Sequence, residues 1–212
     1  MITISAFNTV PDFAKGRVRD LRVRWALEEA SLPYKARLLE QGDQDKPDYR
    51  LLQPFGQVPI IEENGLVQFE SGAIVLHIAE RSDTLLPKDP AGRVHAIQWM
   101  FAALNSVEPF VVNVFLIDFL YAKEQWAKLR RPSAVELMNK KLDAVAKSLG
   151  DKLFLDGERF TAGDLMMATV LRFHSEVAKR NPRLAAYIDR CTARAAFKRA
   201  LQAHLSDFRE AA

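Results

Sequence analysis

The sequence predicts an α/β domain followed by an all-α domain, and two observations carry this prediction. Over about the first 80 residues, β-prone and helix-periodic stretches follow one another in the order βαβ and then ββα. After Pro87 and Pro90, the apolar spacing is helical almost to the end of the chain. A chain of 212 residues is long enough to bury a core in each of two such domains.

The predicted βαβ unit occupies roughly the first forty residues. Residues Ile2–Phe7 alternate between two faces and predict a strand, and Tyr34–Leu39 predict a second one. Between them, apolar residues recur at helical spacing from Val18 to Ala30, and Pro33 follows where that helix ends. A helix that joins two consecutive strands favours a parallel pair with a crossover connection.

A hairpin and a helix complete the first domain. The short strands Val58–Glu62 and Leu66–Phe69 flank an Asn-Gly turn, and a helix is expected over Ser71–Arg81. The polar stretch Glu40–Pro54 is expected to be largely irregular. Together the two halves predict a four-stranded mixed sheet covered by helices, which is the thioredoxin-like plan.

The predicted domain boundaries follow from these patterns. Residues 1–83 form the thioredoxin-like domain, 84–90 a linker with two prolines, and 91–212 an all-helical domain. The helices expected there are Ala91–Tyr121, Pro132–Leu149, Ala162–Lys179, Arg190–Ser206 and a short one at Pro182–Tyr187.

Charge and cysteine content restrict the class of protein. The net charge of +3, from 30 basic and 27 acidic residues, is too small to indicate nucleic-acid binding. The basic clusters Lys15–Arg24 and Arg190–Arg199 predict solvated helix faces, and a positive pocket for a small anion is an alternative for the first cluster. Because Cys191 is the one cysteine, and no run of 18 apolar residues is present, we expect a cytoplasmic protein without a membrane segment.

Two short motifs are suited to binding a small peptide. A cis Val58–Pro59 bond would expose the amide and carbonyl of Val58 to another peptide, whereas a trans proline at a strand start is the alternative. Ser71 is a suitable N-cap for a helix whose first amides bind a carboxylate, and Glu70 can pair with an ammonium group. An anion site beside a cation site suits an α-amino acid, while simple helix capping is the alternative.

In combination, these motifs resemble those of the glutathione transferase family. The resemblance rests on Gln53–Pro59, Glu70–Glu80, Arg22–Glu29 in the first helix and Phe160–Leu165 in the helical domain, and it covers essentially the whole chain. It implies that glutathione is the cosubstrate. The four histidines show no metal-ligand spacing, so no metal is expected.

The resemblance also implies which residues hold glutathione. Pro59 resembles the cis-proline of the family, so the backbone of Val58 is expected to pair with the cysteine of glutathione. Glu70 and Ser71 resemble the residues that hold the γ-glutamyl amine and carboxylate.

The glycine end of glutathione is expected near Gln57 and Gln44. Family members often carry Lys or His at these positions, and both residues are uncharged here. Lys46, two residues from Gln44, is therefore expected to supply the missing charge.

The loop that should act on the sulfur departs from the family pattern. Family members usually place a Tyr, Ser or Cys there, and residues 8–19 contain none of these. We expect Arg17, Thr9 or Asn8 to favour the thiolate instead, by charge near the helix N-terminus or by hydrogen bonding, and a purely structural role in a surface loop is the alternative. A loop without cysteine also argues against disulfide chemistry on glutathione.

The activity implied by the resemblance is detoxification, by conjugation of glutathione to a hydrophobic electrophile through a stabilised thiolate. A non-catalytic glutathione-binding or protein-interaction module, and a glutathione-dependent peroxidase or isomerase, are the alternatives. The electrophile is expected at the junction of the two domains, where Ala91–Tyr121 supplies large apolar side chains. Family members are commonly homodimers, and Phe55 is expected at that interface.

One motif of the helical domain has a structural explanation. Thr161 and Asp164 have the spacing of a capping box, and Phe160 and Leu165 have that of a hydrophobic staple. We therefore expect these residues to stabilise a helix and exclude them from the binding site.

Overall fold

The computed structural model describes residues 1–208 and contains two compact units, which are described separately below. The first unit comprises Met1–Leu85 together with the chain from Arg194, and the second comprises Leu86–Ala193. The predicted domains are 1–83 and 91–212. The structure differs in that the helix Ala195–Ser206 packs in the first unit. Residues 209–212 of the second predicted domain lie outside the described part of the chain.

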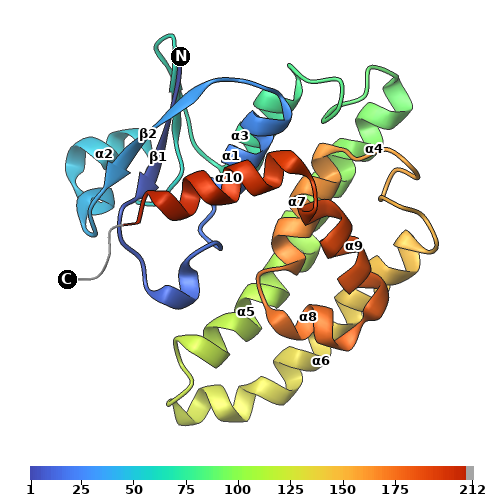
Figure 1. The fold of residues 1–212 in the computed structure, drawn as a ribbon. Helices are drawn as coiled ribbons and strands as arrows, with labels where there is room; N and C mark the ends of the chain where they lie inside the picture. The colour runs from blue at the N-terminus through green and yellow to red at the C-terminus, as the bar shows by residue number, and fades with distance from the viewer. Residues whose placement is uncertain (209–212) are drawn as a thin grey trace. The chain divides into compact units, whose positions relative to one another are not determined.

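A four-stranded mixed sheet forms the first unit, in the order β2-β1-β3-β4 (Figure 1). Its strands are β1 (Ile2–Phe7), β2 (Tyr34–Leu39), β3 (Ile61–Glu63) and β4 (Leu66–Gln68). β1 pairs in parallel with β2, and β3 runs antiparallel to both β1 and β4. The thioredoxin-like plan predicted from the sequence is confirmed.

β3 begins at Ile61, later than the predicted start at Val58. Pro59 has no N–H to donate to a ladder. The N–H of Ile60 donates instead to the hydroxyl of Ser5 at 2.9 Å, and the N–H of Ser5 donates to the carbonyl of Ile60 at 3.0 Å. The segment before β3 is thus fixed to β1 without a regular strand ladder.

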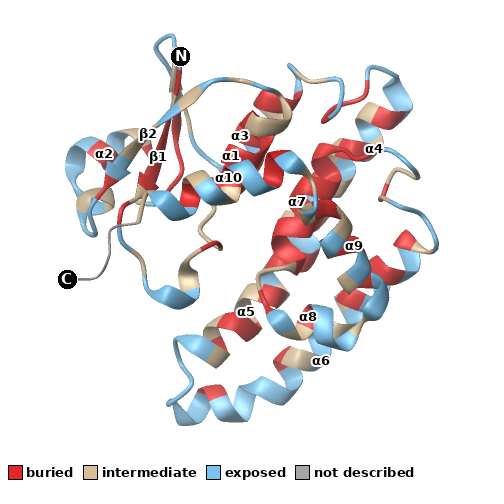
Figure 2. Cartoon of the chain, viewed as in Figure 1, coloured by how far each residue is buried: buried red, intermediate tan, exposed pale blue. Residues whose placement is uncertain are grey.

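Helices cover this sheet. They are α1 (Asp20–Glu29), α2 (Pro47–Leu52), α3 (Ser71–Ala79) and α10 (Ala195–Ser206), with 3-10 turns η1 (Asp12–Ala14) and η2 (Asp43–Asp45). β1 and α1 are largely buried (Figure 2). The predicted first helix, Val18–Ala30, is shorter in the structure by a few residues at its ends.

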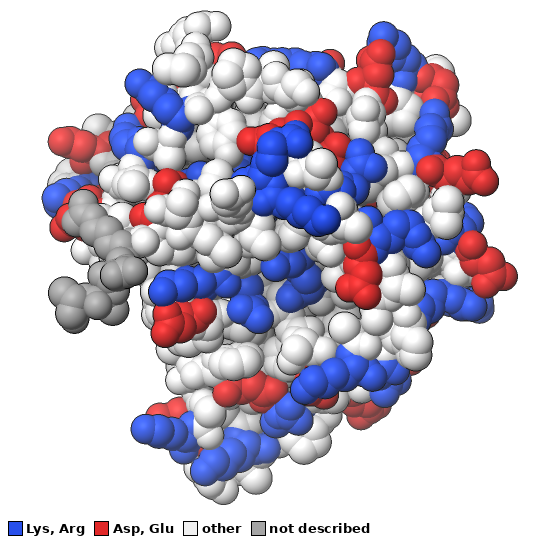
Figure 3. All heavy atoms as spheres, in the orientation of Figure 1, with Lys and Arg blue, Asp and Glu red and all other residues white. Residues whose placement is uncertain are grey.

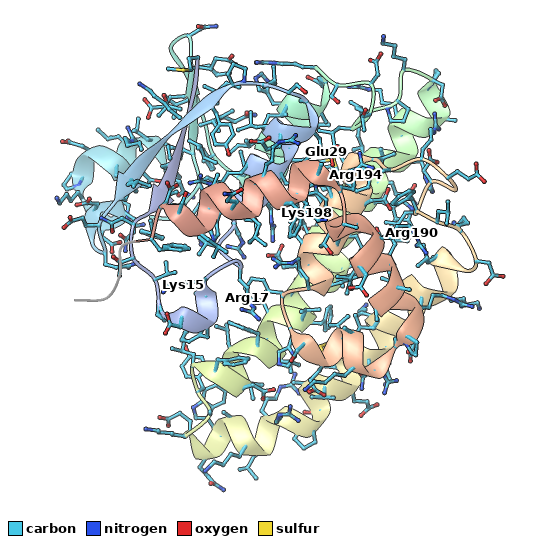
Figure 4. The ribbon with its side chains drawn as sticks, in the orientation of Figure 1. Lys15, Arg17, Glu29, Arg190, Arg194 and Lys198 are labelled. Carbon is cyan, nitrogen blue, oxygen red and sulfur yellow. The ribbon has the colours of Figure 1, made fainter. Side chains whose placement is uncertain are left out.

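α10 packs along α1 although the two helices lie at opposite ends of the chain (Figure 1). The rings of Trp25 and Phe197 meet edge to face, with centroids 4.8 Å apart. Arg194 binds both carboxylate oxygens of Glu29, at 2.6 and 2.7 Å, and these two residues lie side by side in Figure 4. Basic and acidic side chains accordingly lie next to each other on the face that carries α10 (Figure 3). The predicted helix Arg190–Ser206 is interrupted where this ion pair forms.

The second unit is helical throughout its regular structure. Its elements are α4 (Pro90–Phe101), a π-helical segment η3 (Ala102–Val107), α5 (Glu108–Phe119), α6 (Gln125–Leu149), α7 (Ala162–Leu171), α8 (Ser175–Arg180) and α9 (Pro182–Thr192). The predicted single helix Ala91–Tyr121 is divided by the π-helical segment, next to which Pro109 lacks the N–H that a regular helix needs. The predicted helix Ala162–Lys179 ends early, because His174 caps a new helix by accepting from the N–H of Glu176 at 3.1 Å.

Every residue of α7 is buried, and the predicted capping box starts this helix. The backbone N–H of Thr161 donates to Asp164 at 2.9 Å. The same carboxylate accepts from the N–H of Leu155 and the hydroxyl of Tyr187, each at 2.8 Å. Burial raises the pKa of Asp164, and these hydrogen bonds act in the opposite direction. The structural role predicted for the motif is confirmed.

One helical stretch of the second unit, Pro90–Phe119, is long and apolar enough to cross a membrane by length and composition alone. In its most apolar window 44% of the residues are buried inside the protein. Core helices of soluble proteins pass the same test of length and composition.

Candidate functional site

A narrow pocket in the first unit lies where the loop before β3 meets the start of α3. It is lined by Arg19, Gln53, Gln57, Val58, Pro59, Glu70 and Ser71. The pocket therefore joins the two peptide-binding motifs that the sequence indicated, and it adds residues from α1 and from the end of α2.

The first wall of the pocket is the loop that carries Pro59. The Val58–Pro59 bond is cis, which confirms the first of the two sequence interpretations. Among the described residues, the peptide N–H and C=O of Val58 have no hydrogen-bond partner. The preceding carbonyl, of Gln57, accepts from the hydroxyl of Tyr49 at 2.8 Å, and burial raises the pKa of that tyrosine and keeps it protonated. The backbone is thus held in place and left open to a ligand at Val58.

The second wall is the turn into α3. Glu70 has a positive φ (φ 68°, ψ 109°), which non-glycine residues seldom adopt, and strained backbone of this kind clusters at functional sites. Its carboxylate makes no hydrogen bond or ion pair within residues 1–208. Ser71 is the first residue of α3 rather than the predicted N-cap, a position that Glu70 takes. The first-turn amides of α3 remain available to an anion.

The first basic cluster of the sequence is not a solvated helix face. Arg22 and Arg24 are each 2% exposed. Arg22 donates to the hydroxyl of Ser71 at 3.4 Å, so a guanidinium lies directly behind the serine. Burial alone would lower the pKa of Arg24, but the carboxylates of Asp20 and Asp207 raise it above its usual value. Arg24 is thus paired with carboxylates inside the unit, whereas Arg19 of the same cluster lines the pocket.

Of the three residues expected at the glycine end of glutathione, one lines the pocket and two do not. Gln57 lines the pocket. Gln44 accepts from a backbone amide at 2.8 Å and donates to Asp45 at 3.2 Å. Lys46 forms an ion pair with Asp43 at 2.7 Å, and this hydrogen bond raises the pKa of the lysine. Gln44 and Lys46 are thus engaged in the turn around η2, and contact with glutathione requires them to exchange partners.

The three loop residues expected to act on the sulfur are not among those that line the pocket in the described structure. Asn8 is buried, and its backbone N–H is bonded to β2. Thr9 is exposed, and its carbonyl accepts from the side chain of Gln41 at 2.8 Å. Arg17, which lies on the same loop as Lys15 (Figure 4), donates to a carbonyl of its own loop at 2.9 Å.

Sequence reasoning missed two lining residues, Arg19 and Gln53. With the helix predicted to begin at Val18, Arg19 falls inside it, whereas in the structure Arg19 is the N-cap of α1 and faces the pocket. In the sequence, Gln53 is used only as the first residue of the segment Gln53–Pro59, and no role is predicted for its side chain. It is 2% exposed, and its side-chain oxygen accepts from the N–H of Phe55 at 2.6 Å, which shapes the loop.

Neither a group of metal ligands nor the cysteine thiol, the other common reactive elements, contributes to the described pocket. Within residues 1–208, no group of three or more His, Cys, Asp and Glu side chains is arranged to hold a metal ion. Cys191 lies buried in α9 of the second unit.

Comparisons with known proteins agree on one family. Residues 14–80 match the family model described as glutathione S-transferase, N-terminal domain, and residues 123–190 match that of the C-terminal domain. Glutathione S-transferase 3 of Schizosaccharomyces pombe is 30% identical over 165 residues, which are 70% of this chain and 67% of that protein.

Solved structures agree in fold. A glutathione transferase family member from Pseudomonas fluorescens, with two glutathione bound, has a TM-score of 0.82 and 25% identity over 94% of this chain and 92% of that chain. A glutathione transferase from Burkholderia graminis, with two glutathione molecules bound per subunit, has a TM-score of 0.82 over 95% and 87% of the chains, at 24% identity.

The first unit is a thioredoxin-like domain with an open cis-proline backbone and an acidic turn into α3, and a helical unit follows it. This combination defines a class of glutathione-binding proteins. This chain belongs to the glutathione S-transferase family. Family and fold together support a glutathione-binding transferase function in a soluble protein.

Proposed function

We propose that this protein conjugates glutathione to a hydrophobic electrophile. One observation carries the proposal: a single pocket holds the unpaired backbone of Val58, the carboxylate of Glu70 and the N-terminus of α3. A γ-glutamyl peptide needs a backbone partner, an acceptor for its ammonium group and donors for its carboxylate. The glutathione bound to the relative from Pseudomonas fluorescens supports this assignment.

Each end of glutathione has proposed partners. The backbone of Val58, presented by Pro59, pairs with the cysteine, while Glu70 takes the γ-glutamyl ammonium and Ser71 takes the carboxylate. Gln57 takes the glycine end. Gln44 and Lys46 join it there by giving up their present contacts around η2.

Fixed positive charge supports the thiolate. Arg19 lines the pocket, and a cationic group near a thiol favours its anion, whereas Arg22 lies behind Ser71 and supports the carboxylate held there. Arg17, Thr9 and Asn8 remain proposed contributors, and a role for them requires their side chains to turn toward the pocket. Rate enhancement then comes from the lowered thiol pKa and from holding both reactants together.

Binding and turnover test the proposal together. We expect the protein to be retained on immobilised glutathione and to turn over chlorodinitrobenzene. Glu70→Gln should weaken glutathione binding by about tenfold, since a hydrogen bond to a charged group is lost. Glu63→Gln is the matched control, because that carboxylate pairs with Arg81 outside the pocket and its loss should leave affinity unchanged. No retention of the unmodified protein would overturn the proposal.

A non-catalytic glutathione-binding module is the second candidate. The observation that favours it is the loop 8–19, which has no Tyr, Ser or Cys. Retention on glutathione without turnover of a broad electrophile panel would support this module. Turnover of a hydroperoxide or an isomerisation substrate, without conjugation, would indicate instead a glutathione-dependent peroxidase or isomerase.

We also propose a homodimer in the cytoplasm, with Phe55 at the interface and detoxification as the role. Phe55 is 62% exposed and Phe69 is 37% exposed, and their rings meet edge to face with centroids 6.3 Å apart, which forms a small apolar patch. An exposed apolar patch of this kind commonly marks an interface. Gel filtration should give twice the monomer mass of 24.0 kDa, and Phe55→Glu should shift it toward the monomer.

A further inference from the structure

His204 in α10 is a buried histidine whose two ring nitrogens bind the two ends of one short segment. It is 1% exposed. Its Nε2 accepts from the backbone N–H of Gly16 at 3.1 Å, and its Nδ1 lies 2.9 Å from Oδ2 of Asp20. One side chain from the end of the chain thus holds residues 16 and 20 near its beginning.

These contacts fix the form of the imidazole. A backbone N–H can only donate, so Nε2 of His204 carries no proton. The neutral ring therefore has its proton on Nδ1, which donates to the carboxylate of Asp20. Only this tautomer satisfies both partners at once.

The loop before α1 depends on this contact at Gly16. Neighbouring amides of the loop bond locally: the N–H of Ala14 reaches the carbonyl of Pro11, and the N–H of Arg17 reaches that of Ala14. Gly16 is buried with φ of 73°, a backbone that favours glycine, and its N–H points to α10 instead. The histidine therefore supplies a long-range anchor for the loop.

The anchor is firm because α10 is held on α1 by buried charges. Asp20 is 1% exposed and accepts from Arg24 at 2.8 Å on the same oxygen that binds His204. Arg24 also forms an ion pair with Asp207, just beyond α10. The charged groups around His204 therefore come from both helices: Asp20 and Arg24 from α1, and Asp207 from the residue that follows α10.

We propose that His204 is a positioning residue for glutathione binding. Arg17 and Arg19 lie between the two anchored residues, and Arg19 lines the glutathione pocket. With Gly16 and Asp20 both fixed, the segment presents Arg19 to the pocket before a ligand arrives, and such preorganisation lowers the cost of binding. This inference rests on the proposed glutathione-binding function.

Two conservative variants separate the contacts. In His204→Asn, the side-chain amide can replace the Nδ1 donor to Asp20 but does not reach Gly16. In His204→Gln, the longer side chain can replace the Nε2 acceptor for Gly16. We expect calorimetry to give about tenfold weaker glutathione binding for His204→Asn, the loss of one ordered hydrogen bond, and restoration to within about threefold for His204→Gln.

His174 provides the matched control. It is also buried, at 4% exposure, and it also joins a backbone N–H, of Glu176, to a carboxylate, of Asp118, but it lies in the second unit. His174→Gln should lower the denaturation midpoint and leave glutathione affinity unchanged. Unchanged affinity in His204→Asn, or an equal loss in both His204 variants, would overturn the proposal.

Nitrogen NMR of the unmodified protein tests the anchor without any substitution. We expect a protonated Nδ1 and an unprotonated Nε2 for His204, and a Gly16 amide resonance that shifts in His204→Asn. The opposite tautomer would overturn the proposal. If the unmodified protein binds no glutathione, the proposed function fails, whereas normal binding with unaffected His204 variants would overturn only this inference.

Discussion

Two parts of the first unit border the same pocket region and are held in place in different ways. The segment from Gln53 to Ser71 is held partly by nearby groups, such as the hydroxyl of Tyr49, eight residues from the carbonyl of Gln57 that it binds, and partly by Ser5 in β1, which binds Ile60. The loop before α1 is held at Gly16 by His204, 188 residues away. A motif therefore identifies the first part, because its proline and its turn into α3 leave signals in the local sequence, and gives little information on the second.

The largest expected effect is on the long-range side of this comparison. Asp20→Ala removes the carboxylate that joins Arg24 to His204, and all three side chains are at most 2% exposed. Losing one partner of a buried charge pair should cost about 4 kcal/mol of unfolding free energy. Urea denaturation measures the loss. A cost below about 1 kcal/mol, as for surface pairs, would mean that α10 is not an anchor.

A slightly smaller loss is expected from a purely structural site in the second unit. Asp164→Ala leaves the N–H of Thr161, the N–H of Leu155 and the hydroxyl of Tyr187 without their acceptor. Buried donors without partners should cost about 3 kcal/mol in total. Glutathione affinity, measured below the denaturation midpoint, should stay the same. A parallel drop in affinity would show that stability alone controls the pocket.

An intermediate effect distinguishes two arginines of the loop. Arg19→Gln removes a charge from the pocket lining and should weaken glutathione binding by about tenfold, whereas Arg17→Gln should change it by less than about threefold. Thiolate absorbance of bound glutathione, followed against pH, should show a higher thiol pKa in Arg19→Gln. The reverse order would restore Arg17 as the main group acting on the sulfur.

The smallest effect is expected at the far end of α3. Arg81 binds both carboxylate oxygens of Glu63, and this hydrogen bond lowers the pKa of Glu63. Because the folded pKa lies below the unfolded value of about 4.3, the stabilisation is present above that value and is lost as the pH falls through the folded pKa. Glu63→Gln should cost about 0.5 kcal/mol at neutral pH and nothing in acid. Thermal melts at several pH values measure this difference.

The sequence predicts the fold well where patterns are local. The strands of the sheet, the helix α3 and the capping box of Thr161 all follow from periodicity and short-range signals. The sequence does not reveal interruptions within long helical patterns, as at Pro109 and His174. The apolar periodicity continues across each break, because the break depends on one backbone hydrogen bond that is lost or formed there.

For the pocket, too, the sequence indicates the residues that lie in local motifs and misses one that depends on distant contacts. Val58, Pro59, Glu70 and Ser71 line one pocket, and each lies in a motif with its own backbone geometry. Arg19 is not predictable in this way, because the start of α1 depends on a loop whose position is set by α10.

The packing of α10 on α1 has a consequence for synthesis on the ribosome. Trp25 is fully buried, yet the ring that covers it, Phe197, is translated 172 residues later. At typical elongation rates this interval is on the order of 10–30 seconds, during which the apolar face of α1 lacks its final cover and is open to chaperones. The first unit is thus completed by α10, a helix that is synthesised after the whole of the second unit.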